Sequence, residues 1–206
     1  MGAGKTELVG FLCKKYGLQP FFEPHEGNPY LEDFYKDMKG YGLRSQLYFL
    51  TAKLKLHRQL EAAPGAIIQD RTIYEDAEIF ARTLHQQGSM SDVDYENYVA
   101  LFNCMVGFLR SPDLIVYLKA SPETLMGRIA KRGRESEKAI GIDYIQRLND
   151  AYDDWMRRAA LTSEVLTIDT DAVPMQGDTP AFRDLIARLK ERYPRQAELR
   201  LDSGRD

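Results

Sequence analysis

The chain alternates short apolar runs with longer amphipathic segments. Four of the apolar runs have the length of buried strands and stand at residues 19–22, 66–69, 114–118 and 165–168. The segments around them carry apolar residues at i, i+3 and i+4 and predict helices over residues 5–16, 30–36, 43–62, 73–86, 91–109, 121–134, 142–158 and 181–192. Strands that alternate with helices favour a parallel sheet covered by helices on both faces.

Residues that begin and end helices support these boundaries. Gly17 follows the first helix, where a left-handed glycine commonly ends one. Ser91 and Ser121 can cap helix starts, and Pro122 suits a first helical position. Because no repeat, linker or composition shift interrupts the pattern, residues 1–206 are expected to form a single domain, with a charged tail over 194–206 that frays.

The composition is that of a globular domain, and it narrows the function classes. Hydrophobic residues make up 44% and charged residues 29% of the 206 positions, and the net charge of −3 gives no electrostatic case for binding nucleic acid. No apolar run approaches the roughly 18 residues of a membrane helix. Cys13 and Cys104 lack metal-ligand spacing and indicate free thiols. These features favour a cytoplasmic protein without membrane or nucleic-acid partners.

The first six residues carry the clearest chemistry. They match the second half of the phosphate-binding pattern Gly, four residues, Gly-Lys-Ser/Thr, through Gly2, Ala3, Gly4, Lys5 and Thr6. Glycines let backbone N–H groups close around phosphate oxygens, and the helix N-terminus that follows favours negative charge. Lys5 would reach the β- and γ-phosphates of ATP, and the Thr6 hydroxyl would bind Mg²⁺. A flexible glycine-rich terminus is the alternative.

The leading glycine of that pattern would fall one residue before Met1. A phosphate-binding loop normally follows a buried strand, and no residues for one stand ahead of it here. We therefore expect an α/β domain that lacks its first strand, either because the start codon is assigned too far downstream or because the chain is a fragment. The upstream reading frame should then encode a short apolar strand and a glycine.

Charged residues also follow two of the predicted strands. In parallel sheets the ligand lies beyond the carboxyl ends of the strands, so these residues are expected to converge with Lys5. Glu23 could accept the proton of an attacking hydroxyl, although an acid in a solvated loop is the alternative. Asp70 could hold Mg²⁺ through water and Arg71 could neutralise phosphate charge, with a structural ion pair as the alternative.

A basic run ends the helix that is predicted to start at residue 121. Arg128 and Arg132 are four residues apart and are expected to share a helix face, and Arg134 follows a glycine. Three guanidinium groups in this arrangement suit a mobile lid that closes over a polyphosphate. The alternative is a solvated basic face, whose charge Glu135 and Glu137 partly offset.

In order and spacing, these residues resemble the deoxynucleoside kinases, the family that includes bacterial deoxyadenosine and deoxyguanosine kinases. The likeness extends along nearly the whole chain, through residues 2–6, 22–24, 28–35, 46, 70–76 and 128–135. It implies a P-loop NTPase-like, three-layer α/β fold with an arginine-rich lid. The five-stranded parallel sheet of that fold would lack its first strand in this chain.

The resemblance also implies a role for each matching position. Glu23 would be the general base at the 5′-hydroxyl of the sugar, assisted by Arg71. The other positions would hold the sugar 3′-hydroxyl (Tyr35 and Glu137), the base (Gln46 and Asp76) and the phosphates (Arg128, Arg132 and Arg134 of the lid). Lys53 stands where many relatives have an arginine that helps to bind the base, which leaves its role and the base preference open.

The implied reaction is ATP- and Mg²⁺-dependent phosphorylation of a deoxynucleoside 5′-hydroxyl in nucleotide salvage, by a homodimer or a heterodimer with a related subunit. Gln46 and Asp76 favour deoxyadenosine or deoxyguanosine over thymidine. Two alternatives remain. A nucleoside-monophosphate kinase of the thymidylate type would need cationic groups near its acceptor phosphate, where Glu23 offers a carboxylate. A non-catalytic nucleoside-binding subunit of a paired kinase would bind nucleotides without turnover.

Overall fold

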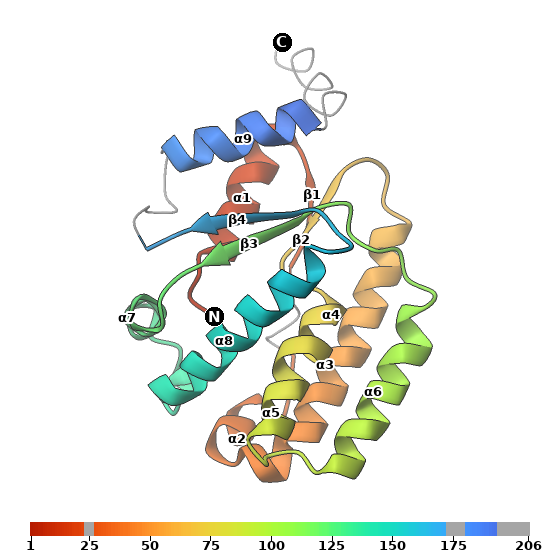
Figure 1. The fold of residues 1–206 in the computed structure, drawn as a ribbon, viewed down its shortest axis with the longest axis vertical. Coiled ribbons are helices and arrows are strands. Elements are labelled where there is room, and N and C mark those ends of the chain that lie inside the picture. Colours follow the sequence, from red (N-terminus) through yellow and green to blue (C-terminus); the bar gives the residue numbers. More distant parts are fainter. Residues whose placement is uncertain (23–26, 172–179, 193–206) are drawn as a thin grey trace.

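The strands of the computed structural model form two parallel pairs (Figure 1). The structure describes residues 1–22, 27–171 and 180–192. In the first pair β1 (Gln19–Phe21) lies beside β2 (Ile67–Gln69), and in the second β3 (Ile115–Lys119) lies beside β4 (Val165–Asp169). Each strand lies within one residue of its predicted bounds, so the apolar runs located the strands correctly.

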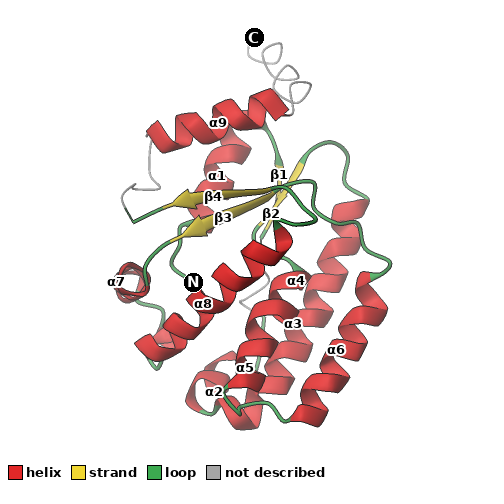
Figure 2. Ribbon diagram, in the orientation of Figure 1, coloured by secondary structure: helices red, strands yellow, loops and turns green. Residues whose placement is uncertain are grey.

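Helices make up most of the described chain (Figure 2). One of them, over residues 73–86, has an α-helical start and end around a wider π-helical stretch. None of the helices in the described ranges combines the length and the apolar character that crossing a bilayer requires. The helical bounds are α1 Lys5–Tyr16, α2 Leu31–Lys36, α3 Met38–Glu61, α4 Ile73–Glu75, the π stretch Asp76–Ala81, α5 Arg82–Gln86, α6 Asp92–Val106, α7 Pro122–Arg132, a 3₁₀ turn Glu135–Glu137, α8 Ile142–Ala159 and α9 Pro180–Arg192.

Helices cover the strands on two sides (Figure 1). On one side lie α1 and α9, where Leu8 and Leu12 pack in one cluster with Leu118 of β3. On the other side lies α8, whose Ile145 packs in a second cluster with Leu125 of α7. A bundle of α3, α5 and α6 stands beside the sheet. The expected helix–sheet–helix layering is therefore present.

The predicted helix caps are confirmed. Gly17 adopts φ 67° and its N–H donates to the Cys13 carbonyl at 2.8 Å, which ends α1. The Ser91 hydroxyl accepts from the Asp94 N–H at the start of α6, and Ser121 caps α7 in the same way. A left-handed glycine and two serine hydroxyls set these boundaries through bonds within one helical turn, which is why the sequence located them well.

Two helical features differ from the prediction. α3 begins at Met38 rather than at residue 43, because the Asp37 carboxylate accepts the Gly40 N–H at 3.0 Å and caps the helix five residues earlier. A β-carbon at Gly40 would collide with that carboxylate, so the glycine there serves the cap and does not mark a loop. The π stretch begins at Asp76, a predicted site residue, as π-helical segments often do at functional positions.

A large cavity lies between the two strand pairs. Its volume is about 870 Å³, and its walls include Ile68 of β2 and Val116 of β3 but no residue of β1 or β4. Within the described residues, each of these two strands pairs along one edge, so the cavity lies along their unpaired edges. Leu8 of α1 and Trp155 of α8 also line it. The cavity is therefore bounded by the edges of β2 and β3 and by side chains of α1 and α8.

We predict that an apolar strand ahead of Met1 fits this cavity. Each buried Val or Ile contributes about 1.5–3 kcal/mol, and ordering its backbone costs about 1–2 kcal/mol. A chain extended by five such residues and a glycine should therefore melt about 5–10 °C higher than the present chain. The matched control is an extension of equal length with serines at the apolar positions. Equal melting temperatures for the two extensions would contradict the prediction.

Candidate active site

The phosphate-binding loop lies beyond the carboxyl ends of the strands. The arrowheads of β3 and β4 point toward α7 and the N-terminus (Figure 1). Gly2 and Gly4 adopt φ 69° and 87°, a region that glycine enters without steric cost. A β-carbon at Gly2 would also lie 3.0 Å from the Leu125 carbonyl oxygen. The two glycines are therefore required by this loop, which argues against a flexible terminus.

The loop leads directly into α1. Gly4 at its start offers no side chain to accept the first N–H groups of the helix. Those groups and the helix dipole make the twelve-residue helix a suitable end for an anion. The predicted place for the β- and γ-phosphates of ATP therefore has the backbone donors that this chemistry needs.

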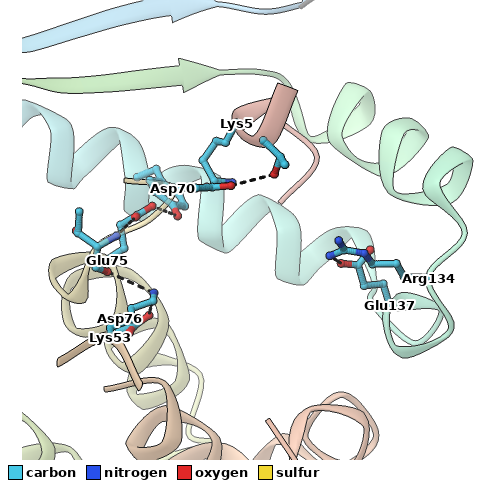
Figure 3. A network of polar contacts seen from close by, with 10 residues as sticks. Lys5, Lys53, Asp70, Glu75, Asp76, Arg134 and Glu137 are labelled. Atoms are coloured by element: carbon cyan, nitrogen blue, oxygen red, sulfur yellow. Dashed lines mark hydrogen bonds and ion pairs between the residues drawn. The ribbon is translucent and has the colours of Figure 1, made fainter. Parts of the chain in front are cut away.

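Lys5 lies beside Asp70, the residue that follows β2 (Figure 3). The Thr6 hydroxyl donates to Asp70 Oδ2 at 2.9 Å, and Lys5 Nζ lies 3.8 Å from Asp70 Oδ1. Asp70 is buried, and its own N–H donates to the Phe21 carbonyl at 2.8 Å. The expected convergence of the loop with a strand-end carboxylate is confirmed in this geometry.

This pair of oxygen ligands fits Mg²⁺. The buried Asp70 Oδ1 makes no hydrogen bond within the described residues, although Lys5 lies within ion-pair distance. No group of three or more His, Cys, Asp or Glu in the described ranges could enclose a metal ion. Mg²⁺ needs no such cage, because it keeps several waters and takes one or two protein oxygens beside the phosphates. Thr6 and Asp70 suit that role.

Arg71 follows Asp70 in an unusual backbone conformation. Its φ is 63°, which places a residue with a long side chain in the left-handed region. The guanidinium carbon lies 4.8 Å from the centre of the Phe80 ring. This stacking holds the cation near the end of β2, where the resemblance places an assistant to the general base. The predicted base itself, Glu23, lies outside the described residues.

Two of the residues predicted to bind the base, Lys53 of α3 and Asp76 of the π stretch, lie together (Figure 3). Lys53 and Asp76 have side chains that are 0% and 2% exposed, and Lys53 Nζ lies 2.6 Å from Asp76 Oδ1. Gln46 stands two turns before Lys53 on the same buried face of α3. Its Oε1 makes no hydrogen bond within the described residues. A buried amide oxygen in that state is ready to accept from a ligand.

Glu137 already pairs with two arginines of the proposed lid, so a sugar hydroxyl bound there would share its carboxylate with them. Both of its oxygens lie 2.6 Å from Arg132 Nη2, and Arg134 Nη1 lies 3.8 Å from Oε1. Tyr35, the other residue expected at the sugar 3′-hydroxyl, has its hydroxyl 3.6 Å from Met1 Sδ. Glu137 does offset the arginine charge, as the alternative for this basic run supposed.

The three lid arginines do not gather at one point. Arg128 donates to the Thr170 hydroxyl at 3.0 Å and to its carbonyl at 2.6 Å, whereas Arg132 and Arg134 contact Glu137. The expectation that Arg128 and Arg132 point together is therefore wrong in this structure. The reason is that the segment after β4 offers Arg128 a carbonyl acceptor that spacing along one helix cannot reveal.

Sequence reasoning missed one buried hydroxyl near the site. Tyr144 belongs to the cluster that packs against Tyr35, and its hydroxyl has no hydrogen-bond partner within the described residues. Burial raises the pKa of Tyr144 well above its ordinary value, the nearby Tyr35 adds to the rise, and Arg71 opposes it. The hydroxyl therefore keeps its proton and remains an unused donor. Its position on an amphipathic helix gave no signal beyond that of a core residue.

Glu75 was missed for a different reason. It is 8% exposed, its Oε2 accepts the Thr72 N–H at 2.8 Å, and its Oε1 accepts the Tyr152 hydroxyl at 2.7 Å. The position of Glu75 three residues after Thr72 fits a capping box, and this signal was available in the sequence. Its contact with α8, which spans 77 positions, was not.

Comparison with known proteins agrees with this site and fold. A model of the deoxynucleoside kinase family matches residues 1–192, and the chain belongs to that family. It is similar to a deoxyadenosine kinase of Dictyostelium discoideum, with 40% identity over 169 residues that cover 82% of this chain and 69% of that protein. It is also similar to a deoxyguanosine kinase of Bacillus subtilis, with 31% identity over 93% of each chain.

Solved structures show the same fold. The structure of deoxyadenosine kinase from M. mycoides with the products dCMP and dCDP superposes with a TM-score of 0.84 and 32% identity, over 93% of this chain and 95% of that chain. Another structure of that kinase holds dATP, with a TM-score of 0.80. The predicted family and the P-loop NTPase-like α/β class are therefore confirmed.

Proposed function

We propose that this protein transfers the γ-phosphate of ATP to the 5′-hydroxyl of a purine deoxynucleoside. The observation that carries the proposal is the meeting of Lys5 and Thr6 with Asp70 at the strand ends. The buried set of Gln46, Lys53 and Asp76 supports a neutral, hydrogen-bonding acceptor such as a nucleobase. Family membership and the names of the relatives point to the same reaction.

The donor side needs charge neutralisation more than covalent chemistry. Lys5 and the first N–H groups of α1 would bind the phosphates, and Thr6 with Asp70 would hold Mg²⁺. The metal ion, when bound, offsets the charge that develops on the transferring phosphoryl group. Arg71, fixed over Phe80, would offset charge near the attacking oxygen.

The acceptor side is built from buried polar atoms. Gln46 Oε1 would accept from the base, and Asp76 would bond the base while Lys53 keeps its carboxylate oriented. Tyr35 and Glu137 would bind the sugar 3′-hydroxyl. A pocket of this kind rejects analogues that leave its polar groups unpaired. The preference for deoxyadenosine or deoxyguanosine over thymidine is proposed on this ground and on the relatives' names.

Glu137 would link the sugar site to the lid. Its carboxylate contacts Arg132 and Arg134, so a sugar that binds to Glu137 changes the surroundings of both guanidinium groups. Arg128 is instead held at Thr170, on the segment after β4. We propose that Arg132 and Arg134 form the mobile part of the lid and that Arg128 forms its fixed edge.

Arg132→Ala should lower turnover by at least about tenfold, because a guanidinium aimed at the transferring phosphate acts mainly in the transition state. Unfolding free energy should fall by less than about 1 kcal/mol, since the pair with Glu137 is partly exposed and Arg134 remains nearby. Arg132→Lys should rescue little, because lysine lacks the planar fork. Steady-state kinetics and thermal melts measure both quantities.

Lys131→Ala is the matched control for this prediction. Lys131 is exposed and precedes Arg132 on α7, so its loss removes the same charge without touching Glu137. Turnover should then stay within about twofold of the unmodified protein. Equal turnover in the Arg132 and Lys131 variants would mean that the basic run is a solvated helix face and not a lid.

The test of the proposed function is a panel of deoxynucleosides with ATP and Mg²⁺, run on the chain with and without the strand extension. We expect monophosphate formation with higher kcat/KM for deoxyadenosine or deoxyguanosine than for thymidine. Glu23→Gln keeps the shape and removes the proton acceptor, so turnover should fall about 10²–10⁴-fold while deoxynucleoside binding survives. Activity that persists in this variant would come from a contaminating kinase or from another base.

The same panel separates the two alternatives. Phosphorylation of a deoxynucleoside monophosphate in place of the nucleoside would favour a kinase of the thymidylate type. Nucleotide binding without any turnover, in the extended chain as well, would favour a non-catalytic subunit of a paired kinase.

We also propose a homodimer. Apolar side chains on and just after α6 are exposed, namely Val93 at 66%, Leu101 at 44% and Phe108 at 87%. Exposed apolar side chains gathered along one element are typical of interfaces between proteins. Light scattering on the purified chain would give the mass of a dimer in this case. The mass of a single chain would favour a heterodimer with a related subunit.

A further inference from the structure

The backbone at Arg71 lies in a conformation that its side chain disfavours. Its φ is 63°, and no other non-glycine residue in the described ranges has a positive φ. A β-carbon in the left-handed region crowds the following carbonyl oxygen, so the conformation persists only where the surrounding structure fixes it. Residues that hold Arg71 in this state are therefore expected around it.

Hydrogen bonds hold the backbone of both residues that flank Arg71, Asp70 and Thr72. On the preceding side, the Asp70 N–H donates to the Phe21 carbonyl at 2.8 Å within the sheet. On the following side, the Thr72 N–H donates to Glu75 Oε2 at 2.8 Å (Figure 3). Because both flanking residues are held, few combinations of φ and ψ remain open to Arg71. The bond from Glu75 is the one that a side chain supplies.

Glu75 is itself held from across the molecule. It is 8% exposed, and its second oxygen accepts the Tyr152 hydroxyl of α8 at 2.7 Å. The Tyr152 ring stacks on Tyr117 of β3, with ring centres 5.9 Å apart and planes at 12°. The carboxylate therefore joins the turn after β2 to α8, and it has little freedom to move away from Thr72.

We infer that Glu75 and Tyr152 are positioning residues for Arg71. They hold the Thr72 peptide so that Arg71 stays left-handed, and this backbone state directs the guanidinium over the Phe80 ring beside the strand ends. The use of that guanidinium in phosphoryl transfer rests on the proposed function. The claim about the backbone does not.

An ordinary helix cap is the competing explanation. Glu75 stands at the third position of α4 and bonds the N-cap N–H, as a capping box requires. A cap would stabilise the start of the helix whatever the conformation of Arg71. It would also not depend on Tyr152. The two explanations therefore predict different couplings between Arg71 and Glu75.

Thermal melts of Arg71→Gly and Arg71→Ala, compared in three backgrounds, measure that coupling without an activity assay. In the unmodified background, Arg71→Gly should melt about 2–8 °C above Arg71→Ala, because glycine adopts the left-handed region without steric cost. Both changes remove the guanidinium, so its lost contacts cancel in the comparison. With Glu75→Ala also present, the backbone at position 71 is no longer held left-handed, and the gap in melting temperature should shrink below about 2 °C. Tyr152→Phe, which keeps the stacked ring, is a milder second background and should narrow the gap as well.

Steady-state kinetics on the strand-extended chain give the second measurement. Glu75→Ala and Tyr152→Phe should each lower kcat by about tenfold or more and leave KM for ATP within about twofold, because Lys5 and Thr6 are untouched. Glu75→Gln should keep most of kcat, since its amide oxygen still accepts the Thr72 N–H. Tyr117→Phe is the matched control, because its hydroxyl bonds Asp153 and not Glu75. That variant should keep kcat within about twofold.

The outcomes separate this inference from the proposed function. A gap between the glycine and alanine variants that survives the loss of Glu75 overturns the inference, whatever the activity. A gap that closes while kcat is unchanged in Glu75→Ala establishes the backbone role and contradicts the use proposed for the Arg71 guanidinium. Equal loss of kcat in Tyr117→Phe and Tyr152→Phe would show a general effect of the tyrosine stack and would also overturn the inference.

Discussion

Lys5→Met should lower kcat by about 10²–10³ in the strand-extended protein, with little loss of stability. Lys5 begins α1 and reaches Asp70 at 3.8 Å, so it stands at the place where the loop meets the strand ends. A fixed cation at the transferring phosphate stabilises charge that grows in the transition state, and removing one such donor typically costs this factor. Thr6 still donates to Asp70 at 2.9 Å, so the buried carboxylate keeps a partner.

Lys14→Met is the matched control on the same helix. Lys14 is exposed in the last turn of α1, where a positive charge interacts favourably with the helix dipole and stabilises the helix by about 0.3–1 kcal/mol. Its loss should lower the melting temperature by a few degrees at most and leave kcat unchanged. If Lys5→Met and Lys14→Met had the same turnover, the phosphate-binding role of the first six residues would be wrong.

Patterns within one element were the part of the fold that the sequence could predict. Gly17, Ser91 and Ser121 set helix boundaries through bonds to residues three or four positions away, and these boundaries were found nearly as expected. The strand-end rule was also sufficient to bring Lys5 and Asp70 together, because it depends on the order of strands and helices alone.

Apart from that convergence, the sequence could not predict which side chains meet between elements. Arg128 shares a helix with Arg132, yet a carbonyl after β4 holds its guanidinium elsewhere. Glu75 meets Tyr152 across 77 positions, and no spacing rule connects them. The left-handed backbone at Arg71 had no signal either, since such strain is held by the surrounding structure and not by the residue that bears it.

The sequence left the role of Lys53 open, and the structure shows it as one half of a buried ion pair with Asp76. Lys53→Met should lower the free energy of unfolding by about 3–5 kcal/mol, which corresponds to a melting temperature about 6–20 °C lower. Lys53 and Asp76 are 0% and 2% exposed and lie 2.6 Å apart, so the variant leaves a carboxylate buried without this cation. Lys53 Nζ also lies 3.3 Å from the Thr72 carbonyl. Lys55→Met, an exposed change two positions along α3, should stay within about 0.5 kcal/mol.

The double variant Lys53→Met with Asp76→Leu separates stability from recognition. Replacing a buried ion pair by apolar side chains is often neutral or stabilising, so most of the lost melting temperature should return. Binding of the deoxynucleoside should not return, because Asp76 no longer offers a carboxylate to the base, and KM should rise at least about tenfold. A double variant with normal KM would show that Asp76 does not bind the base. One that melts as low as Lys53→Met would mean that the pair is needed for packing beyond its charges.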